Sequence, residues 1–248
     1  MKGGTGGLAP LAVVIPARDE APRLPSLLAD LARAPELVRE VWVVDGGSLD
    51  GTASVARLGG ARVLRERPSR GWQLRRGIAV SSAPWLLLLH ADGRLPARWP
   101  QAVARAMAMG PERCWAFHLA IAGPGLGLRL VERLVSWRTR LFALPYGDQG
   151  LLVHRQALRQ VGGVAPIPLM EDLDLVLRLR ALMPVRLMEG RYLVDGRRWR
   201  RLGVIGTSWR NAQLRRAWRR GEDPRRLAER YGAYQKAQRR CWGSSSQP

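Results

Sequence analysis

Short, mostly apolar runs alternate with longer segments along the first half of the chain. Runs of four or five such residues are too short for a helix and too uniform for a half-exposed strand, so they predict strands buried on both faces. Pro16 should end the first run, because a proline inside a central strand removes a hydrogen bond of the ladder. The expected strands cover residues 11–15, 41–44, 61–64 and 85–89.

The segments between these strands carry helical patterns. Leu24, Leu27, Leu28 and Leu31 share one face of an amphipathic helix, and residues 70–81 form a basic helix. Strands that alternate with helices over short connections are typical of a mostly parallel sheet covered by helices on both faces. The first half of the chain therefore predicts the α/β class.

The second half of the chain continues in the same class. Strands are expected at 114–121, 151–153, 185–188 and 192–195. Helices are expected at 97–109, at 126–144, from Glu171 onward, and twice between 204 and 240 with a break near 221–224. The organisation predicted is a flexible amino terminus at 1–10, an α/β unit at 11–200 with halves 11–110 and 111–200, a basic helical extension at 201–242 and a disordered tail at 243–248.

The helix expected at 126–144 has an unusual surface. Leu130, Leu134, Trp137 and Leu141 lie on one face, and four arginines lie elsewhere on the helix. Such a helix can lie on a membrane surface. Alternatively, the apolar stripe packs on the sheet and the arginines are solvated. The pattern leaves both interpretations open.

The formal net charge of +21 predicts attraction to anions, which include nucleotide phosphates, acidic lipid headgroups and nucleic acids. Lys2 and Lys236 are the only lysines among 41 basic residues, and this skew indicates coding bias as a partial cause of the charge. Cys114 and Cys241 lie far apart and indicate neither a zinc site nor a disulfide framework.

Neither a signal peptide nor a bilayer span of roughly 18 to 20 apolar residues is expected. A reduced, cytoplasmic setting is therefore predicted, with peripheral attachment at the inner face of the membrane as an option.

Acidic residues follow three of the expected strands. Asp19 or Glu20 comes after the first strand, Asp45 after the second, and Asp92 after the fourth. The carboxyl ends of parallel strands meet at one edge of a sheet, where ligands bind in open α/β folds. His90 and Asp92, at a spacing of two, project to the same side if the chain there is extended. The sequence thus predicts a ligand site at the carboxyl edge.

Five segments, taken together, resemble the family 2 glycosyltransferases, which have the GT-A fold. They occur in the order and spacing of that family at Val14–Glu20, Val43–Thr52, His90–Asp92, Gly147–Gly150 and Met170–Asp172. The segment Leu89–Asp92, followed by Leu95–Pro96, is most similar to a bacterial subgroup called selenodomain-associated transferase 2. In that subgroup L-H-A-D replaces the D-x-D of the wider family.

The resemblance implies a Rossmann-like, mostly parallel central sheet flanked by helices, with a C-terminal helical extension. It makes 11–110 the nucleotide-binding half and 111–200 the acceptor half. The implied function is inverting transfer of a sugar from a UDP- or GDP-sugar to a hydroxyl of an unknown acceptor. The resemblance places the nucleotide against Pro16, Ala17, Arg18, Glu20, Asp45, Gly46, Ser48, Arg75, Arg76, Gly77, Ala91 and Asp92.

A metal ion and a general base complete the implied site. Mg²⁺ or Mn²⁺ stabilises the charge that develops on the β-phosphate of the leaving nucleotide, and Asp92 is the expected ligand. His90 either ligates the metal or hydrogen bonds to the ribose or phosphate. Asp172 corresponds to the family's general base, which takes the proton of the acceptor hydroxyl. Asp148, Gln149 and Glu171 are expected to bind the acceptor.

Two alternatives compete with this hypothesis. A nucleotidyltransferase would need a glycine-rich phosphate loop after the first strand, but the glycine-rich stretch at 3–7 precedes it. A basic peripheral membrane or anion-binding protein would explain the charge, but it leaves the acids at the sheet edge unexplained. Nucleic acid is not an expected partner, because no recognisable nucleic-acid module is present.

Overall fold

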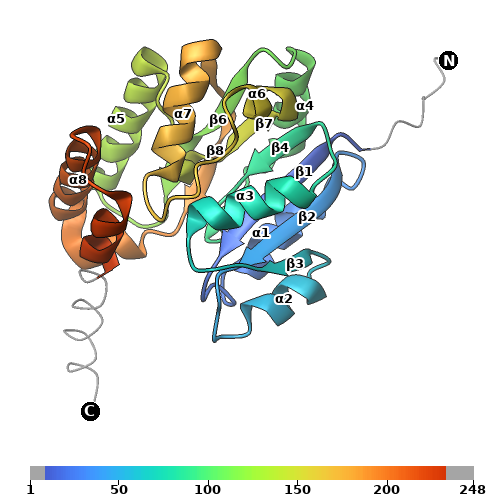
Figure 1. The fold of residues 1–248 in the computed structure, drawn as a ribbon, viewed down its shortest axis with the longest axis horizontal. Coiled ribbons are helices and arrows are strands. Elements are labelled where there is room, and N and C mark those ends of the chain that lie inside the picture. Colours follow the sequence, from blue (N-terminus) through green and yellow to red (C-terminus); the bar gives the residue numbers. More distant parts are fainter. Residues whose placement is uncertain (1–8, 233–248) are drawn as a thin grey trace.

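One twisted sheet runs through the computed structural model, which describes residues 9–232 (Figure 1). Among these residues eight strands pair in the order β3-β2-β1-β4-β7-β6-β8-β5. Their bounds are β1 Leu11–Ala17, β2 Val38–Asp45, β3 Arg62–Arg65, β4 Trp85–Leu88, β5 Gly93–Arg94, β6 Cys114–Ile121, β7 Leu151–His154 and β8 Val185–Val194.

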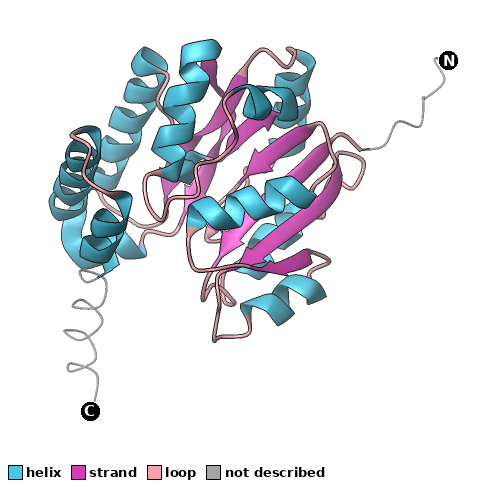
Figure 2. Cartoon of the chain, in the orientation of Figure 1, coloured by secondary structure: helices cyan, strands magenta, loops and turns pink. Residues whose placement is uncertain are grey.

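Helices cover both faces of the sheet, as Figure 2 shows. Apolar side chains of α1, α4 and α5 join the core on one face, and those of α3, α6 and α7 join the core on the other. The bounds are α1 Leu24–Leu31, α2 Thr52–Leu58, α3 Arg70–Val80, α4 Trp99–Ala108, α5 Leu126–Phe142, α6 Arg155–Gln160, α7 Glu171–Leu182 and α8 Arg197–Arg219, with a 3-10 turn η1 at Gly147–Gln149. The three-layer α/β fold is confirmed.

The sheet is mostly parallel, as predicted, but β7 and β5 run against their neighbours. The two strands expected at 185–188 and 192–195 are one strand, β8, which pairs with β6 along its length. The register shifts where Ala116 pairs with Leu187 and His118 pairs with Arg191. Gly190 has a φ of 96° there, so the interruption in the apolar pattern is a bulge and not a loop.

Strand β1 continues through Pro16 to Ala17, so the prediction that Pro16 ends the strand was wrong. The Val14 carbonyl accepts a hydrogen bond from Leu89 N, on the side of β4. Pro16, two residues further along, faces the same side as Val14, but β4 ends at Leu88. The missing N–H of the proline therefore removes no bond of the ladder, and β1 still pairs with β2 at this position.

The C-terminal helices pack on the second half of the α/β unit. Helix α8 begins at Arg197 rather than at Val204 and is broken at Gly203, whose φ is 68°. It crosses the domain boundary expected at residue 200, and a further helical segment covers 224–232. A third core cluster joins both segments to α7 and contains Leu144, Met170, Leu173, Val176, Leu214 and Leu227. Residues 1–8 and 233–248, where most of the flexible amino terminus and all of the disordered tail were expected, lie outside the described residues.

Candidate active site

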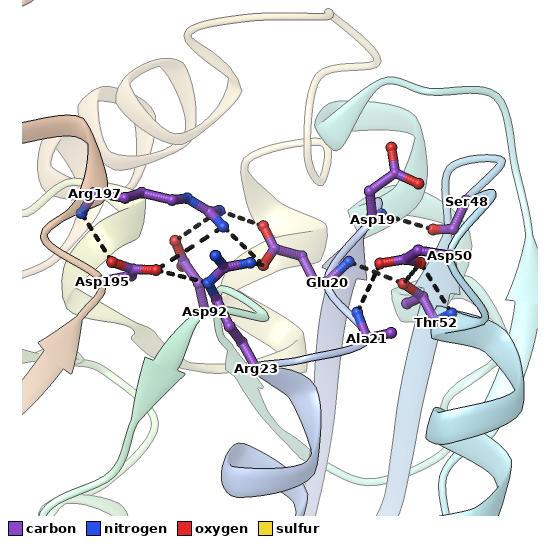
Figure 3. A network of polar contacts seen from close by, with 10 residues as sticks. All are labelled: Asp19, Glu20, Ala21, Arg23, Ser48, Asp50, Thr52, Asp92, Asp195 and Arg197. Atoms are coloured by element: carbon purple, nitrogen blue, oxygen red, sulfur yellow. Dashed lines mark hydrogen bonds and ion pairs between the residues drawn. The ribbon is translucent and has the colours of Figure 1, made fainter. Parts of the chain in front are cut away.

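A network of acids and arginines connects the carboxyl ends of β1 and β8 with the loop after β4 (Figure 3). Arg197, in the first turn of α8, donates to Glu20 and lies 3.3 Å from the Asp92 carboxylate through Nη2. Arg23 donates to Glu20 Oε2 at 3.1 Å and to Asp195 Oδ2 at 2.6 Å. The predicted convergence of Glu20 and Asp92 is thus present, and Arg197 bridges the two carboxylates.

The loops after β1 and β2 hold each other in place. Ser48 donates to the buried carboxylate of Asp45 through its backbone N and its hydroxyl, and it accepts a hydrogen bond from Asp19 N at 2.9 Å. Glu20 N donates to Thr52 Oγ1 at 2.9 Å. These contacts fix the backbone of the loop that carries Glu20 and hold Asp45 at the end of β2.

A glutamine on α3, which the sequence analysis did not single out, links the two strand ends. Gln73 is buried and donates through Nε2 to Ala17 O at 3.0 Å and to Val44 O at 2.7 Å. A Cβ on Gly46 would meet Gln73 Nε2 at 3.0 Å, so a larger residue here would require Gln73 to shift by a few tenths of an ångström. The sequence could have indicated Gln73, because it is a polar residue on the buried face of the helix predicted at 70–81.

A second cluster forms around Gly147, between η1, α3 and α7. A Cβ on Gly147 would lie 2.8 Å from Arg70 Nη2, 2.8 Å from His90 Nε2 and 3.0 Å from Asp172 Oδ2, so the three side chains converge on one point. Gly147 N donates to Asp172 Oδ2 at 2.8 Å, and Arg70 contacts the His90 ring. The expected base, Asp172, is half-buried and held by backbone N–H groups.

Glu171 lies beside Asp172, and its side chain is 1% exposed. Burial raises the pKa of Glu171 to about 7, against the opposing effect of Arg70, whose Nε lies 2.9 Å from Oε1. Burial lowers the pKa of Arg70, but Glu171 and Asp172 more than offset this and raise it. A group with a pKa near neutrality inside a cleft is a feature of functional sites.

His90 and Asp92 belong to different clusters. Strand β4 ends at Leu88, and residues 91–92 form a turn, so the extended chain assumed for the H-x-D spacing is absent. His90 points toward Arg70 and Gly147, whereas Asp92 points toward Glu20 and Arg197. The expectation that the two side chains project together was wrong, because the backbone turns between them.

Tyr192 of β8 packs against the buried side of this turn. Its side chain is fully buried, and its hydroxyl donates to the His90 carbonyl at 2.7 Å. A Cβ on Gly93 would lie 1.9 Å from the tyrosine ring, so only glycine allows this approach. The sequence does not indicate that Gly93 contacts Tyr192.

Helix α3 places Arg70, and not Arg75 or Arg76, at this cluster. Arg75 and Arg76 are exposed further along the helix, which leads away from the carboxyl edge. Gly77 is buried, and a Cβ there would meet Val14 Cγ1 at 2.5 Å and Val44 Cγ2 at 3.0 Å. The close approach that Gly77 permits is therefore that of α3 to the sheet, and not to a pyrophosphate.

The remaining residues that the sequence predicted for the site differ in their exposure to solvent. Arg18 is exposed beside the loop after β1, and Ala17 and Ala91 are buried at the strand ends. Gln149 is fully buried, donates to Phe117 O at 3.0 Å and accepts from Tyr146 N at 3.2 Å. Its side chain thus holds the η1 turn that carries Gly147 and Asp148, and Asp148 is half-buried there.

A small pocket opens at the second cluster, around Gly147. Its walls combine the end of β1, the loop after β4, η1 and the first turns of α3 and α7. The lining includes Pro16, Arg70, Leu74, Leu88, Leu89, His90, Pro145, Tyr146, Gly147, Leu151, Glu171, Asp172, Leu175 and Val176. Its volume is about 30 Å³, so it marks the point where polar groups converge beside an apolar wall and is smaller than a substrate.

The residues at the rim fit a divalent cation that arrives with a diphosphate. In the described part of the chain no three His, Cys, Asp or Glu side chains form a group able to hold a metal ion. Mg²⁺, however, is commonly held by one or two carboxylates, with phosphate oxygens and water at the other positions. Asp92 and Glu20 supply two carboxylates around a shared arginine, and that donor set is suitable.

Comparison with known proteins identifies a family and relatives that are similar to this chain in sequence. The model of the family described as Glycosyl transferase family 2 matches residues 12–148. An uncharacterized glycosyltransferase of Mycobacterium tuberculosis is 31% identical over 159 residues, which are 61% of this chain and 71% of that protein. A counterpart in Mycobacterium bovis matches to the same extent.

Solved structures share the fold at low identity. A mannosyltransferase from Pyrobaculum calidifontis, in complex with GDP-Man and Mn²⁺, aligns with a TM-score of 0.63 at 16% identity, over 84% of this chain and 61% of that one. A glucosyl-3-phosphoglycerate synthase from Mycobacterium tuberculosis, in complex with Mn²⁺, UDP and glucosyl-3-phosphoglycerate, aligns with a TM-score of 0.55 at 20% identity, over 75% of this chain and 70% of that one. The chain spans 64% of a further mycobacterial protein, with a TM-score of 0.54 at 23% identity.

Proposed function

The chain belongs to glycosyl transferase family 2, and on that premise we propose that this glycosyltransferase moves a sugar from a nucleotide-diphosphate donor to an acceptor hydroxyl with inversion at the anomeric carbon. The observation that carries the proposal is that two carboxylates lie near opposite ends of the short segment His90–Asp92, in the loop after β4. Asp92 lies in the rim network with Glu20, and Asp172 lies beside His90 at the pocket. Inverting transfer needs charge stabilisation on one side of the sugar and a base on the other.

The donor nucleotide occupies the loops after β1 and β2 in this proposal. Asp45 accepts from the base, Glu20 from the ribose, and the strand end at Pro16 and Ala17 lines the base. Arg18, Gly46, Ser48 and Ala91 line the same rim. The similar structures hold UDP in one case and GDP-Man in another, so the proposal covers both donor classes.

Asp92 would hold Mg²⁺ or Mn²⁺ bound with the diphosphate, and this ion would neutralise the charge that develops on the leaving phosphate. For this, Arg197 must release the Asp92 carboxylate, and its guanidinium then lies next to the phosphates and adds a second positive charge. Arg70 keeps His90 oriented toward Gly147. We therefore assign His90 a hydrogen bond to phosphate or ribose in preference to direct ligation.

Asp172 takes the proton of the acceptor hydroxyl as that oxygen attacks the anomeric carbon. Its Oδ2 accepts a hydrogen bond from Gly147 N, which orients the carboxylate at the pocket. A carboxylate can serve as base at neutral pH because the alcohol proton is lost largely in the transition state. Glu171 and Asp148 shape the acceptor side, and Gln149 acts by positioning the η1 turn.

Two single variants separate the two carboxylates. Asp92→Ala should abolish the stabilisation that a nucleotide sugar gives in the presence of Mn²⁺ or Mg²⁺, because the metal loses its protein ligand. Asp172→Asn should keep that stabilisation and lower turnover by about 10²–10⁴-fold, since the base is lost. The measurement is thermal unfolding with UDP-, GDP-, CDP- and dTDP-sugars, with and without metal, followed by product formation from the donor that binds.

Glu189→Gln on β8 is the matched control, because its side chain is 74% exposed and does not line the pocket. At 100 times its dissociation constant a donor adds about 2.7 kcal/mol of stability, which such a screen detects readily. A folded wild-type protein that no donor stabilises, or an Asp172→Asn variant with normal turnover, would contradict the proposal.

A further inference from the structure

Helix α5 turns its apolar stripe away from the protein. Leu130 is 57% exposed, Trp137 61% and Leu141 57%, and Leu126 and Leu134 are exposed on the same face. The interpretation in which this stripe packs on the sheet was therefore wrong. Helix α8, which lies against Gly127 through Val204, carries two more exposed apolar side chains, Ile205 and Trp209.

Polar contacts on the inner face hold α5 in this rotation. Glu132 is buried beneath the helix, accepts from Ile121 N at 2.7 Å and from Arg129 Nη1 at 3.0 Å, and pairs with Arg191 of β8. Turning the apolar stripe inward would bring Glu132 into water and break its contacts with Ile121 and Arg191. The exposed stripe is thus a stable feature of the fold.

Arginines lie along one side of the stripe. At 100° per residue, Arg129, Arg133 and Arg140 fall on one flank of α5, between the sheet and the apolar face. Arg140 also lines an open groove of about 830 Å³ at the amino end of β6 and β8, together with Arg113 and Arg186. Among the described residues no acid lines this groove.

One wall of the groove holds an unused donor. The Trp115 indole Nε1 is buried and makes no hydrogen bond within the described residues. Burial lowers the pKa of His118, in the same groove, and Arg140 and Arg191 lower it further. This ring is therefore uncharged near neutral pH and adds no positive charge to the groove. The protein covers this indole N–H group, so the groove offers three guanidinium groups to an anion.

We propose that the α5 face, defined as Leu126, Leu130, Leu134, Trp137 and Leu141 with the flanking Arg133 and Arg140, docks on an anionic lipid bilayer. An apolar stripe flanked by cations has the composition of a helix that lies in the plane of a membrane surface. The stripe enters the boundary of the acyl chains, while the arginines and the groove bind lipid phosphates. No helix in the described part of the chain is long and apolar enough to cross the bilayer.

Charge favours a bilayer over a second copy of the chain. A symmetric dimer through this face would bring the arginine flanks of two molecules together, each with a net charge of +21. Anionic headgroups instead attract the basic residues near the membrane surface and neutralise their charge. The inference rests on the geometry of α5 and is independent of the proposed sugar transfer.

Flotation of the full chain with vesicles tests the inference. We expect binding to vesicles of phosphatidylcholine with about one-third phosphatidylglycerol and little binding to pure phosphatidylcholine, with a loss of binding as salt rises. Replacing Trp137 and Leu141 by alanine should weaken partitioning about tenfold, because two apolar side chains no longer enter the boundary. Arg140→Gln should weaken it about fivefold, and only for the anionic vesicles.

Matched controls come from α2, where Arg57 and Leu58 are exposed far from α5. Arg57→Gln and Leu58→Ala should leave flotation unchanged, and urea unfolding should show that every variant is folded. Three results would overturn the inference. The first is wild-type protein that fails to float with anionic vesicles at low salt, and the second is that all variants float alike. The third is light scattering that gives a stable dimer which Trp137→Glu dissociates, since the face would then be a subunit interface.

Discussion

Glu171 stands at the start of α7 with its carboxyl group buried beside Arg70. An acid in the first turn of a helix is expected to favour the charged form, because it faces the positive end of the helix dipole. Here burial is the larger effect, and it raises the pKa of Glu171 to about 7. Near neutral pH the pocket therefore contains a carboxyl group that is partly protonated, next to Asp172.

This pKa makes the stability of the folded protein depend on pH. Between about pH 4.5 and pH 7 the folded protein keeps a proton on Glu171 that the unfolded chain has lost, so the free energy of unfolding falls as pH rises through this window. Glu171→Gln cannot ionise and should lack this fall. The free energy of unfolding of wild type relative to the variant should decrease by up to about 3 kcal/mol from pH 4.5 to pH 7.5.

Urea unfolding at a series of pH values measures this difference. The same series with Glu189→Gln, an exposed carboxyl group on β8, should run parallel to wild type. Parallel profiles for Glu171→Gln and wild type would mean that Glu171 titrates normally in the folded protein.

At the scale of an element, the contact of α3 with the sheet decides which residue of that helix reaches the site. Gly77 lets α3 approach β1 and β2 through Val14 and Val44. That approach fixes the rotation of the helix, with Gln73 at the strand ends and Arg70 at the pocket. A helix moved outward at Gly77 would loosen both contacts.

Gly77→Ala should destabilise the protein by about 1–3 kcal/mol, because the added methyl group overlaps Val14 and must be accommodated by a shift of the helix. The measurement is the free energy of unfolding in urea. Gly232→Ala is the control, since a Cβ there meets nothing within 4 Å. Equal losses for the two variants would point to a general effect of alanine rather than to packing of α3 on the sheet.

The whole molecule carries a net charge of +21, and most of its arginines lie outside the ion pairs at the rim. Self-repulsion at such a charge destabilises the folded state, and salt screens it over a distance of about 8–10 Å near physiological ionic strength. The close pairs around Glu20 and Glu132 are partly buried and are screened less. On balance, added salt should stabilise the fold.

The midpoint of thermal unfolding should therefore rise by about 2–4 °C between low and moderate concentrations of sodium chloride, which corresponds to about 1 kcal/mol for a chain of this size. A double variant that exchanges the exposed Arg39 and Arg57 for glutamate lowers the net charge and should respond less. A midpoint that falls with salt would show that attraction within ion pairs outweighs repulsion.

The sequence by itself determined the α/β class, most element positions and the convergence of acids at the carboxyl edge. Buried strands are short apolar runs, and helices show their buried face through the spacing of leucines, so both are local properties of the chain. Glu20 and Asp92 meet because parallel strands end at one edge. Spacing and residue type also sufficed for the family resemblance, which the comparison with known proteins confirmed.

Tertiary structure decided what depends on contacts between distant residues. The turn after β4 separates His90 from Asp92, and Tyr192, about a hundred positions away, holds that turn. The outward face of α5 was equally beyond the sequence, because an amphipathic helix can present either side to the sheet. Glu132 selects the side through Ile121 and Arg191, and such partners become neighbours only when the chain is folded.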